Sequence, residues 1–317
     1  MMNNHEEFKH VSVLLEESIN ALQVRDGGIY VDGTLGGAGH SGLLLQTADI
    51  QKLIGIDRDK KAIEVAGSRL ARYGEKVSLV NDNFCNIAMI LDDLGIGKID
   101  GGLLDLGVSS YQFDEPERGF SYRFDAPLDM RMDNSQGRTA ADVVNEYEEQ
   151  RLAQILADYG EEKYARQIAK KIVAKRPINT TFELVDVIKS AVPPKVRYAE
   201  GKHPAKRCFQ AIRIEVNDEL AILDKTIEDF ADRLNYGGRL AIITFHSLED
   251  RIVKNAFKRL EGGKCTCPKD FPVCVCGKGE SGYEIITKKP ILPSGDELEE
   301  NTRSASAKLR VLSRVRV

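Results

Sequence analysis

The sequence predicts an α/β protein with a doubly wound, mostly parallel sheet that is interrupted by a block of helices. In the first hundred residues, short apolar runs alternate with segments of helical periodicity, as in parallel strands joined by helices. From residue 113 to about residue 207 no convincing strand occurs, and the alternation then resumes. We therefore expect a first part of the core at 1–112, a helical insertion at 113–207 and a second part of the core at 208–317.

The elements before the insertion follow from the period of the apolar residues. Runs typical of buried strands occur at Gly28–Asp32, Lys52–Asp57, Val77–Val80 and Gly101–Leu106. Apolar residues at helical spacing predict helices at Ser41–Gln46, Lys60–Tyr73 and Ile87–Leu94.

The insertion and the C-terminal part are predicted in the same way. Helical spacing recurs at Thr139–Tyr147, Glu149–Tyr159, Glu162–Lys175 and Phe182–Val192, and Pro193-Pro194 ends the last of these. One long helix is expected from about Phe209 to Leu234, ended by Gly237-Gly238. The remaining predicted elements are a strand at Arg239–Phe245, a helix capped by Ser247 that reaches Leu260, and strands at Tyr283–Thr287 and Lys308–Val315.

Composition indicates an ordinary globular protein of 317 residues, with 42% hydrophobic residues and a net charge of −4. No apolar run approaches the roughly 20 residues that span a bilayer, and the N-terminus lacks the pattern of a signal peptide. We therefore expect a cytoplasmic protein without a membrane partner. The charge is uneven, because Lys163–Arg207 contains 12 basic and 3 acidic residues by direct count of the sequence.

A glycine-rich loop follows the first predicted strand, and glycine lets backbone N–H groups approach a ligand closely. Gly37, Gly39 and Gly42 match the dinucleotide pattern literally, but the pattern does not start directly at the strand end. Asp32 before the loop suits the positive amino group of S-adenosylmethionine better than a pyrophosphate. The residues leave three interpretations open: S-adenosylmethionine, a nicotinamide or flavin nucleotide, or glycines that serve only helix–sheet packing.

Other candidate cofactor residues follow neighbouring strands. Asp57 ends the second predicted strand and can accept the hydroxyls of a ribose, and Asp105 ends the fourth. Phe84 follows the third strand, where it packs either on an adenine face or in the core.

Long blocks of this sequence resemble the bacterial ribosomal RNA small subunit methyltransferase H family, also called MraW. They run nearly from end to end and include HVSVLLEE (10–17), YVDGTLGGAGHS (30–41), DGGLLDLGVSSYQFD (100–114), PLDMRMD (127–133), HPAKRCFQAIRIEVNDEL (203–220) and GGRLAIITFHSLEDRIVK (237–254). The resemblance implies a class I S-adenosylmethionine-dependent methyltransferase fold with an inserted α-helical domain. It also implies N4-methylation of a cytidine in the decoding region of 16S rRNA, within the small ribosomal subunit.

The resemblance also implies the cofactor contacts. The expected set, with the neighbouring loop glycine included, is Gly37, Ala38, Gly39, His40, Asp57, Phe84, Asp105 and Gln112. The family often has Gly at the position of Ala38, and a backbone contact tolerates this change if φ there is negative. Phe113 stands where the family usually has Leu.

The reaction requires an acceptor for the cytosine N4–H, because the N4 lone pair is delocalised into the ring. Asp105, or the carbonyls of Leu106 and Gly107, occupy the corresponding place, so Asp105 is the candidate catalytic residue. Stacking on the target base is expected from one of the aromatic residues Tyr111, Phe120 and Tyr122.

The basic segment favours an RNA surface over an ordinary solvated helix face, because its exposed positions are almost all positive. The predicted RNA contacts are Lys163, Arg166, Lys170, Lys206 and Arg207, with His246 after the fifth strand. For His246 the alternative is a polar network beside a helix that Ser247 caps.

Four cysteines, Cys265, Cys267, Cys274 and Cys276, have a spacing that a structural zinc ion accepts. The C-x-C spacing is tighter than usual, so reduced thiols are the favoured interpretation. Two other classes of function remain open. The first is an RNA-binding assembly factor without activity, and the second is a methyltransferase for proteins or small molecules. A homodimer is also open.

Overall fold

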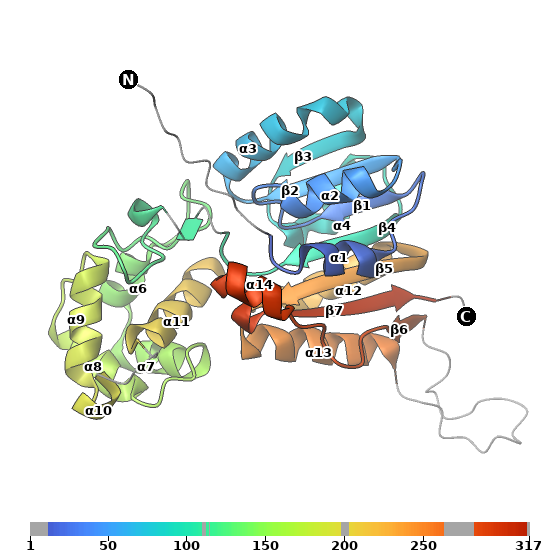
Figure 1. Ribbon diagram of the computed structural model, residues 1–317. Helices are drawn as coiled ribbons and strands as arrows, with labels where there is room; N and C mark the ends of the chain where they lie inside the picture. Colours follow the sequence, from blue (N-terminus) through green and yellow to red (C-terminus); the bar gives the residue numbers. More distant parts are fainter. Residues whose placement is uncertain (1–11, 110–111, 114, 198–202, 263–281, 316–317) are drawn as a thin grey trace, which may run out of the picture. The chain divides into compact units, whose positions relative to one another are not determined.

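A computed structural model describes residues 12–109, 112–113, 115–197, 203–262 and 282–315 (Figure 1). The chain divides into two compact units. The first unit combines the described residues of Met1–Gly107 and Ile222–Val317, and the second unit is Val108–Ala221. Each unit has its own hydrophobic core, and each is described by itself below.

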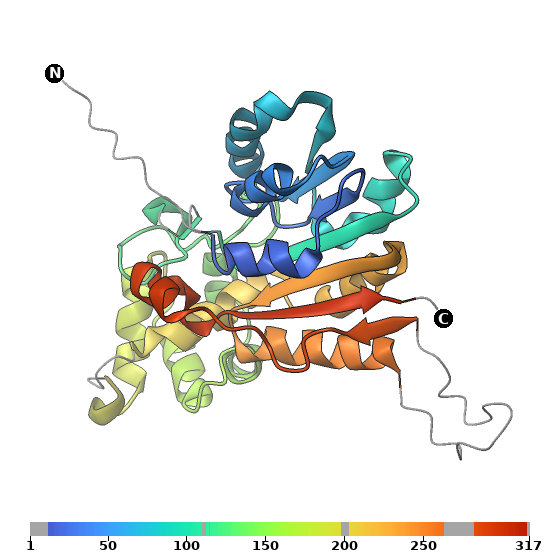
Figure 2. The same ribbon diagram turned by 45° about the vertical axis from the view of Figure 1, so that its right-hand side comes forward.

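The first unit is built on a seven-stranded sheet with the order β3-β2-β1-β4-β5-β7-β6 (Figures 1 and 2). Its strands are β1 (Ile29–Asp32), β2 (Lys52–Asp57), β3 (Val77–Asn81), β4 (Ile99–Asp105), β5 (Leu234–Thr244), β6 (Tyr283–Ile285) and β7 (Lys308–Arg314). The strands β1 to β5 run parallel, and β7 pairs antiparallel with β5 and with β6. The predicted doubly wound, mostly parallel sheet is confirmed.

Hydrophobic clusters cover both faces of this sheet. Successive side chains of a strand point to opposite sides, so neighbouring residues belong to different clusters. Val31, Ile54 and Leu104 belong to one hydrophobic cluster, which includes residues of α4 (Ile87–Asp93), α12 (Leu223–Arg233) and α13 (Ser247–Glu261). Their chain neighbours Tyr30, Leu53 and Leu103 belong to another cluster. The helices that contribute to that cluster are α1 (Leu15–Leu22), α2 (Gly39–Thr47) and α3 (Lys60–Leu70). Because both faces are covered, we expect a ligand to bind at the carboxyl edge of the sheet.

The second unit is helical, and its described residues contain no named strand. Its helices are α6 (Ala140–Glu146), α7 (Glu149–Asp158), α8 (Ala165–Ala174), α9 (Thr181–Ala191), α10 (Pro194–Arg197) and α11 (Ala205–Asn217). Apolar residues at 3–4 spacing, such as Ile168 and Ile172 of α8, are fully buried in one cluster. The four predicted helices of the insertion correspond to α6, α7, α8 and α9.

The long helix expected at Phe209–Leu234 is wrong. The chain forms α11 and α12 in its place, because Asp218 after α11 has a left-handed φ of 51°. Helix α11 packs into the core of the second unit through Cys208, Phe209 and Ile212. The division of the chain therefore falls after Gly107 and after Ala221, and not after residues 112 and 207 as expected.

The two glycines expected to end that helix lie in a strand instead. Gly237 and Gly238 lie inside β5, which begins at Leu234 and not at Arg239. Gly237 has a φ of 77°, and the register between β4 and β5 shifts near this point, between Ile99 and Gly101. Glycine thus marks an irregularity in a strand at this position.

Candidate functional site

Three carboxylates end three adjacent strands of the first unit. Asp32 is the last residue of β1, Asp57 of β2 and Asp105 of β4, and β1 lies between the other two strands. Parallel strands bring these ends to one edge of the sheet. Strand β1 is also where the chain changes direction across the sheet, which is where open α/β sheets bind ligands.

Asp32 is the most deeply buried of the three, with 2% of its surface exposed. Its Oδ1 accepts a hydrogen bond from the Thr34 amide at 3.2 Å, and its Oδ2 accepts one from Ser41 Oγ at 2.7 Å. Burial raises the pKa of Asp32 to about 6, although both hydrogen bonds favour the charged form.

The loop after β1 is fixed by several hydrogen bonds. Asp57 Oδ2 accepts from the Gly36 amide at 2.8 Å, and the Ile56 carbonyl accepts from the Leu35 amide at 2.9 Å. Arg69 Nη1 of α3 donates to the Gly37 carbonyl at 2.6 Å. Asp57 therefore shapes the loop in addition to any contact with a ribose. Burial raises the pKa of Asp57 as well.

The loop leads directly into α2. Gly39 is the first residue of α2, and a Cβ there would lie 2.0 Å from Ser12 Oγ, so only glycine fits without a shift. Ala38 precedes the helix with a φ of 60°, so the condition of a negative φ at this position is not met. An alanine in this conformation costs roughly 1–2 kcal/mol relative to the right-handed region.

Asp105 and His40 face each other at this edge. His40 Nε2 lies 3.1 Å from the Val13 carbonyl, which can only accept, so Nε2 carries the proton. His40 Nδ1 lies 4.0 Å from Asp105 Oδ2. The Asp105 amide donates to Thr34 Oγ1 at 2.6 Å, so Thr34 links the ends of β1 and β4.

The carboxyl group of Asp105 is only partly satisfied. Its side chain is 25% exposed, but its Oδ1 is buried and has no hydrogen-bond partner among the described residues. Burial, followed by the charges of Asp32 and Glu249, raises the pKa of Asp105 well above its usual value. A buried acceptor of this kind requires a donor, which a ligand can supply.

The remaining predicted cofactor residues lie in different units. Phe84 is half-buried beside the core of the first unit, and the absence of a Cβ at Gly33 lets its Cβ approach the loop. Gln112 belongs to the second unit, where its amide donates to Ser109 Oγ at 3.2 Å and its Oε1 accepts from the Ser109 amide at 3.3 Å.

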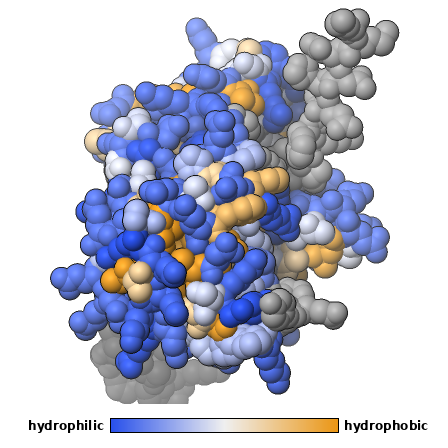
Figure 3. Space-filling view, turned by 90° about the vertical axis from the view of Figure 1, so that its left-hand side faces the viewer, coloured by the Kyte–Doolittle hydropathy of each residue, from blue (hydrophilic) through white to orange (hydrophobic). Residues whose placement is uncertain are grey.

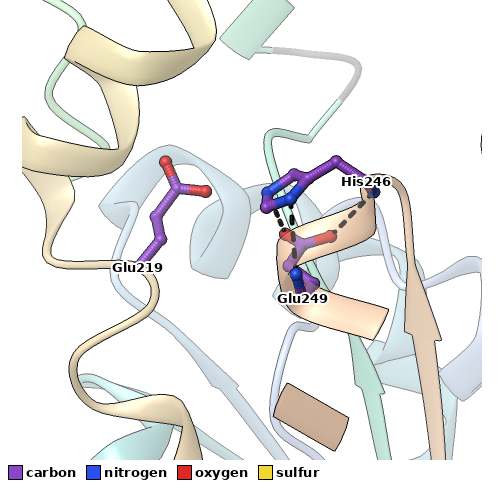
Figure 4. Close-up of side chains that lie close together, drawn as sticks. All are labelled: Glu219, His246 and Glu249. Atoms are coloured by element: carbon purple, nitrogen blue, oxygen red, sulfur yellow. Dashed lines mark hydrogen bonds and ion pairs between the residues drawn. The ribbon is translucent and has the colours of Figure 1, made fainter. Parts of the chain in front are cut away.

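His246 follows β5 and caps α13 (Figure 4). Its Nδ1 accepts from the Glu249 amide at 3.4 Å, and Glu249 Oε2 accepts from the His246 amide at 3.2 Å. The capping role expected of Ser247 therefore belongs to His246. Glu219, also drawn in Figure 4, belongs to the second unit, where Arg213 forms a bidentate pair with it.

Glu249 is a site residue that the sequence prediction missed. It is buried, with 2% of its surface exposed, and its negative charge acts on Asp105. Its Oε1 lies 3.1 Å from His246 Nε2. The signal in the sequence was a capping box that starts at His246, one residue earlier than the serine to which we assigned it.

The predicted RNA contacts of the insertion all lie in the second unit. Lys163, Arg166 and Lys170 are exposed on or beside α8, whose opposite side is buried. Lys206 and Arg207 are exposed in α11, and Arg207 Nη1 donates to the Glu161 carbonyl at 3.0 Å.

Two groups of predicted residues lie outside the part of the chain that the structure describes. These are Tyr111 and the four cysteines Cys265, Cys267, Cys274 and Cys276, so the zinc interpretation stays a prediction. Among the described residues, no helix is long and apolar enough to cross a membrane.

The sheet order and its acidic carboxyl edge define the class of the protein, the class I S-adenosylmethionine-dependent methyltransferases. Within this class the sequence model of the MraW methylase family matches residues 7–315, and the chain belongs to that family. It is 57% identical to "Ribosomal RNA small subunit methyltransferase H" of Lachnospira eligens, over 98% of each chain. It is 59% identical to the protein of the same name from Clostridium botulinum strain Kyoto, over 98% of this chain and 100% of that one. The resemblance seen in the sequence is confirmed.

The raised pKa of Asp32 predicts that this residue destabilises the folded chain at neutral pH. The carboxyl group holds its proton up to about pH 6 when folded, and only to about pH 4 when unfolded. Its unfavourable contribution is therefore absent below about pH 4 and complete above about pH 6, where it amounts to about 3 kcal/mol. We expect Asp32→Asn to raise the melting temperature at pH 7.5 and to leave it unchanged at pH 4.

The matched control for this prediction is Asp49→Asn. Asp49 is exposed, and Lys76 lowers its pKa, so this variant should not gain stability at pH 7.5. Thermal unfolding followed by circular dichroism at both pH values measures the difference. A loss of stability in Asp32→Asn at pH 7.5 would contradict the prediction.

Proposed function

We propose that this chain transfers a methyl group from S-adenosylmethionine to N4 of a cytidine in the decoding region of 16S rRNA. The observation that carries the proposal is the buried Oδ1 of Asp105 at the carboxyl edge of the sheet, an acceptor to which no described residue donates. An exocyclic amino group is a donor that fits this oxygen. The two relatives described above bear names that specify ribosomal RNA of the small subunit.

The residues at the edge fit S-adenosylmethionine, because its sulfonium and amino groups would favour the charged form of the buried carboxyl groups of Asp32, Asp57 and Asp105. When bound, this cofactor supplies an electrophilic methyl group. The residues proposed to hold it are Gly37, Ala38, Gly39, His40, Asp57, Phe84, Asp105 and Gln112. The glycine loop admits the ligand to the backbone, and Arg69 and Asp57 keep the loop in place.

Asp105 is proposed as the acceptor of the N4 proton. Hydrogen bonding from N4–H to a carboxylate increases electron density on a nitrogen that is otherwise a poor nucleophile. The surroundings of Asp105 favour its neutral form, so the carboxylate gains stability when it takes the proton. Thr34 fixes the backbone of Asp105 during this step through its hydroxyl oxygen.

The second unit is proposed to hold the RNA. Arg166 and Lys170 present positive charge from α8, Lys163 adds charge from the turn before it, and Lys206 and Arg207 add charge from α11. Phosphate contacts of this kind give affinity without sequence selectivity. His246 caps α13, and this accounts for its position. We also propose that it contacts the target base. Such a substrate places the protein in the cytoplasm.

The proposal is tested by methyl transfer from labelled S-adenosylmethionine to three substrates: naked 16S rRNA, free small subunits and 70S ribosomes. We expect label at N4 of one cytidine in at least one of them, located by mass spectrometry of nuclease fragments. Protein and small-molecule extracts serve as controls. Label in these extracts with none in any RNA would contradict the proposal.

Removing the carboxylate of Asp105 tests its catalytic role. Asp105→Asn keeps the shape of the side chain but cannot accept a proton, so kcat at saturating S-adenosylmethionine should fall by about 10²- to 10⁴-fold. In the unmodified chain, kcat should rise with pH through the raised pKa of Asp105, because only the carboxylate accepts. Asp57→Asn, the comparison variant, should raise KM for the cofactor with less effect on kcat. Full turnover by Asp105→Asn would refute the role.

The salt dependence of RNA affinity tests the proposed basic surface. Each lost phosphate contact should reduce the slope of log K against log salt by about 0.7–0.9. The double variant Lys163→Gln/Lys170→Gln loses two contacts, so we expect it to reduce the slope by about 1.4–1.8. The double variant Lys254→Gln/Lys258→Gln in α13 of the first unit removes the same charge from exposed positions and should keep the original slope. Filter binding between 50 and 300 mM salt measures both, and equal slopes in the two variants would rule out a specific surface.

A further inference from the structure

Two aromatic rings of the second unit stack in parallel. The rings of Tyr122 and His203 have centroids 4.4 Å apart, with 6° between their planes. Phe209 packs against Tyr122 at 5.8 Å and at 84°, in an edge contact. Phe209 is buried in the core, whereas Tyr122 and His203 are half-buried. The three rings form a row that starts in the core of the second unit and ends at His203.

The row ends at His203, whose side chain is half-buried. Tyr122 covers one face of the His203 ring, and among the described residues no other ring packs on His203. On the face of the molecule shown in Figure 3, hydrophobic side chains reach the surface only in small groups among hydrophilic ones. A flat ring at the end of a stack offers a surface for one more flat group.

The His203 ring is held in one orientation and is uncharged near neutral pH. Its Nδ1 accepts a hydrogen bond from the Ala205 amide at 3.3 Å, so the proton of the neutral ring is on Nε2. Burial and then the positive charge of Lys189 lower the pKa of His203. A fixed ring loses little conformational freedom when a partner stacks on it.

The surroundings of the ring pair are basic. Lys189 acts on the His203 ring, and Lys206 is exposed one turn further along, where its amide donates to the His203 carbonyl at 3.1 Å. Arg123 is exposed directly after Tyr122. Flat rings combined with positive charge are what proteins use to bind unpaired nucleotides.

We propose that the Tyr122–His203 pair is a stacking platform for an unpaired base of the RNA substrate, with Lys189 and Lys206 as contacts for the adjoining phosphates. The inference rests on the proposed function, since it takes RNA as the substrate. Of the three aromatic residues expected from the sequence it takes Tyr122, since Phe120 is buried with 5% exposed and Tyr111 lies outside the described residues. It adds His203, which the sequence prediction missed.

The alternative is that His203 serves only the start of α11 through its bond to Ala205. Two substitutions separate these roles. His203→Asn keeps an acceptor for the Ala205 amide and removes the ring, whereas His203→Phe keeps a ring and removes the acceptor. Phe182→Ala is the control for the loss of an aromatic side chain, because Phe182 is 43% exposed in the same unit and has no ring contact with any described residue.

The experiment measures binding of a short single-stranded RNA that contains 2-aminopurine, whose fluorescence is quenched when a ring stacks on it. Loss of one stacked base should weaken binding by about 5- to 150-fold. We expect this loss, and loss of quenching, in His203→Asn, with both retained in His203→Phe and in Phe182→Ala. Cofactor binding should be the same in all variants.

Other results would overturn the inference. Loss in His203→Phe with retention in His203→Asn would show a capping role alone, and unchanged affinity in both would show that no base stacks there. A loss of the same size in Phe182→Ala would show that the ring pair is not a specific platform. If the unmodified chain binds the cofactor but no RNA and methylates none, the proposed function fails first, and this inference fails with it.

Discussion

The structure depends on holding carboxyl groups in largely buried positions at one edge of the sheet. Asp32, Asp57 and Asp105 share one edge of the sheet with the nearby Glu249, and burial raises the pKa of each of the three aspartates. Hydrogen bonds from the Thr34 and Gly36 amides and the Ser41 hydroxyl offset the cost of burying two of these carboxylates. These hydrogen bonds set the geometry of the glycine loop and of the start of α2. One oxygen of Asp105 has no donor among the described residues.

The two units differ in the sign of the charge that they present. Negative charge at the carboxyl edge of the first unit suits a positively charged small molecule, and it would repel a polyanion. The positive residues of α8 and α11 lie in the second unit, which has a core of its own. In the proposed function, separate units thus let one acidic chain carry opposite fields for a cationic cofactor and for RNA.

The sequence predicted those features that depend on local periodicity. Strands β1 to β4 and the helices between them were found because each is a short apolar or amphipathic run. The break at Asp218 was missed because it rests on one residue in a left-handed conformation, inside a pattern that is apolar on both sides. Likewise, the charge of Glu249 acts on the remote Asp105, and the His203 ring stacks on the remote Tyr122, and no local pattern reveals either relation. The left-handed conformation of Ala38 could not be predicted either, because alanine rarely adopts it.

The pairing of β4 with β5 has a consequence for how the chain folds. Residue Leu104 of β4 lies beside Ile242 of β5, and the whole second unit separates them along the chain. During synthesis the contiguous second unit is complete before β5 leaves the ribosome, so it can fold while the sheet still lacks β5 and β7. Until then β4 presents an unpaired edge, which is a target for wrong pairing. Closure of the sheet over this long loop is therefore expected to be the slow step of folding.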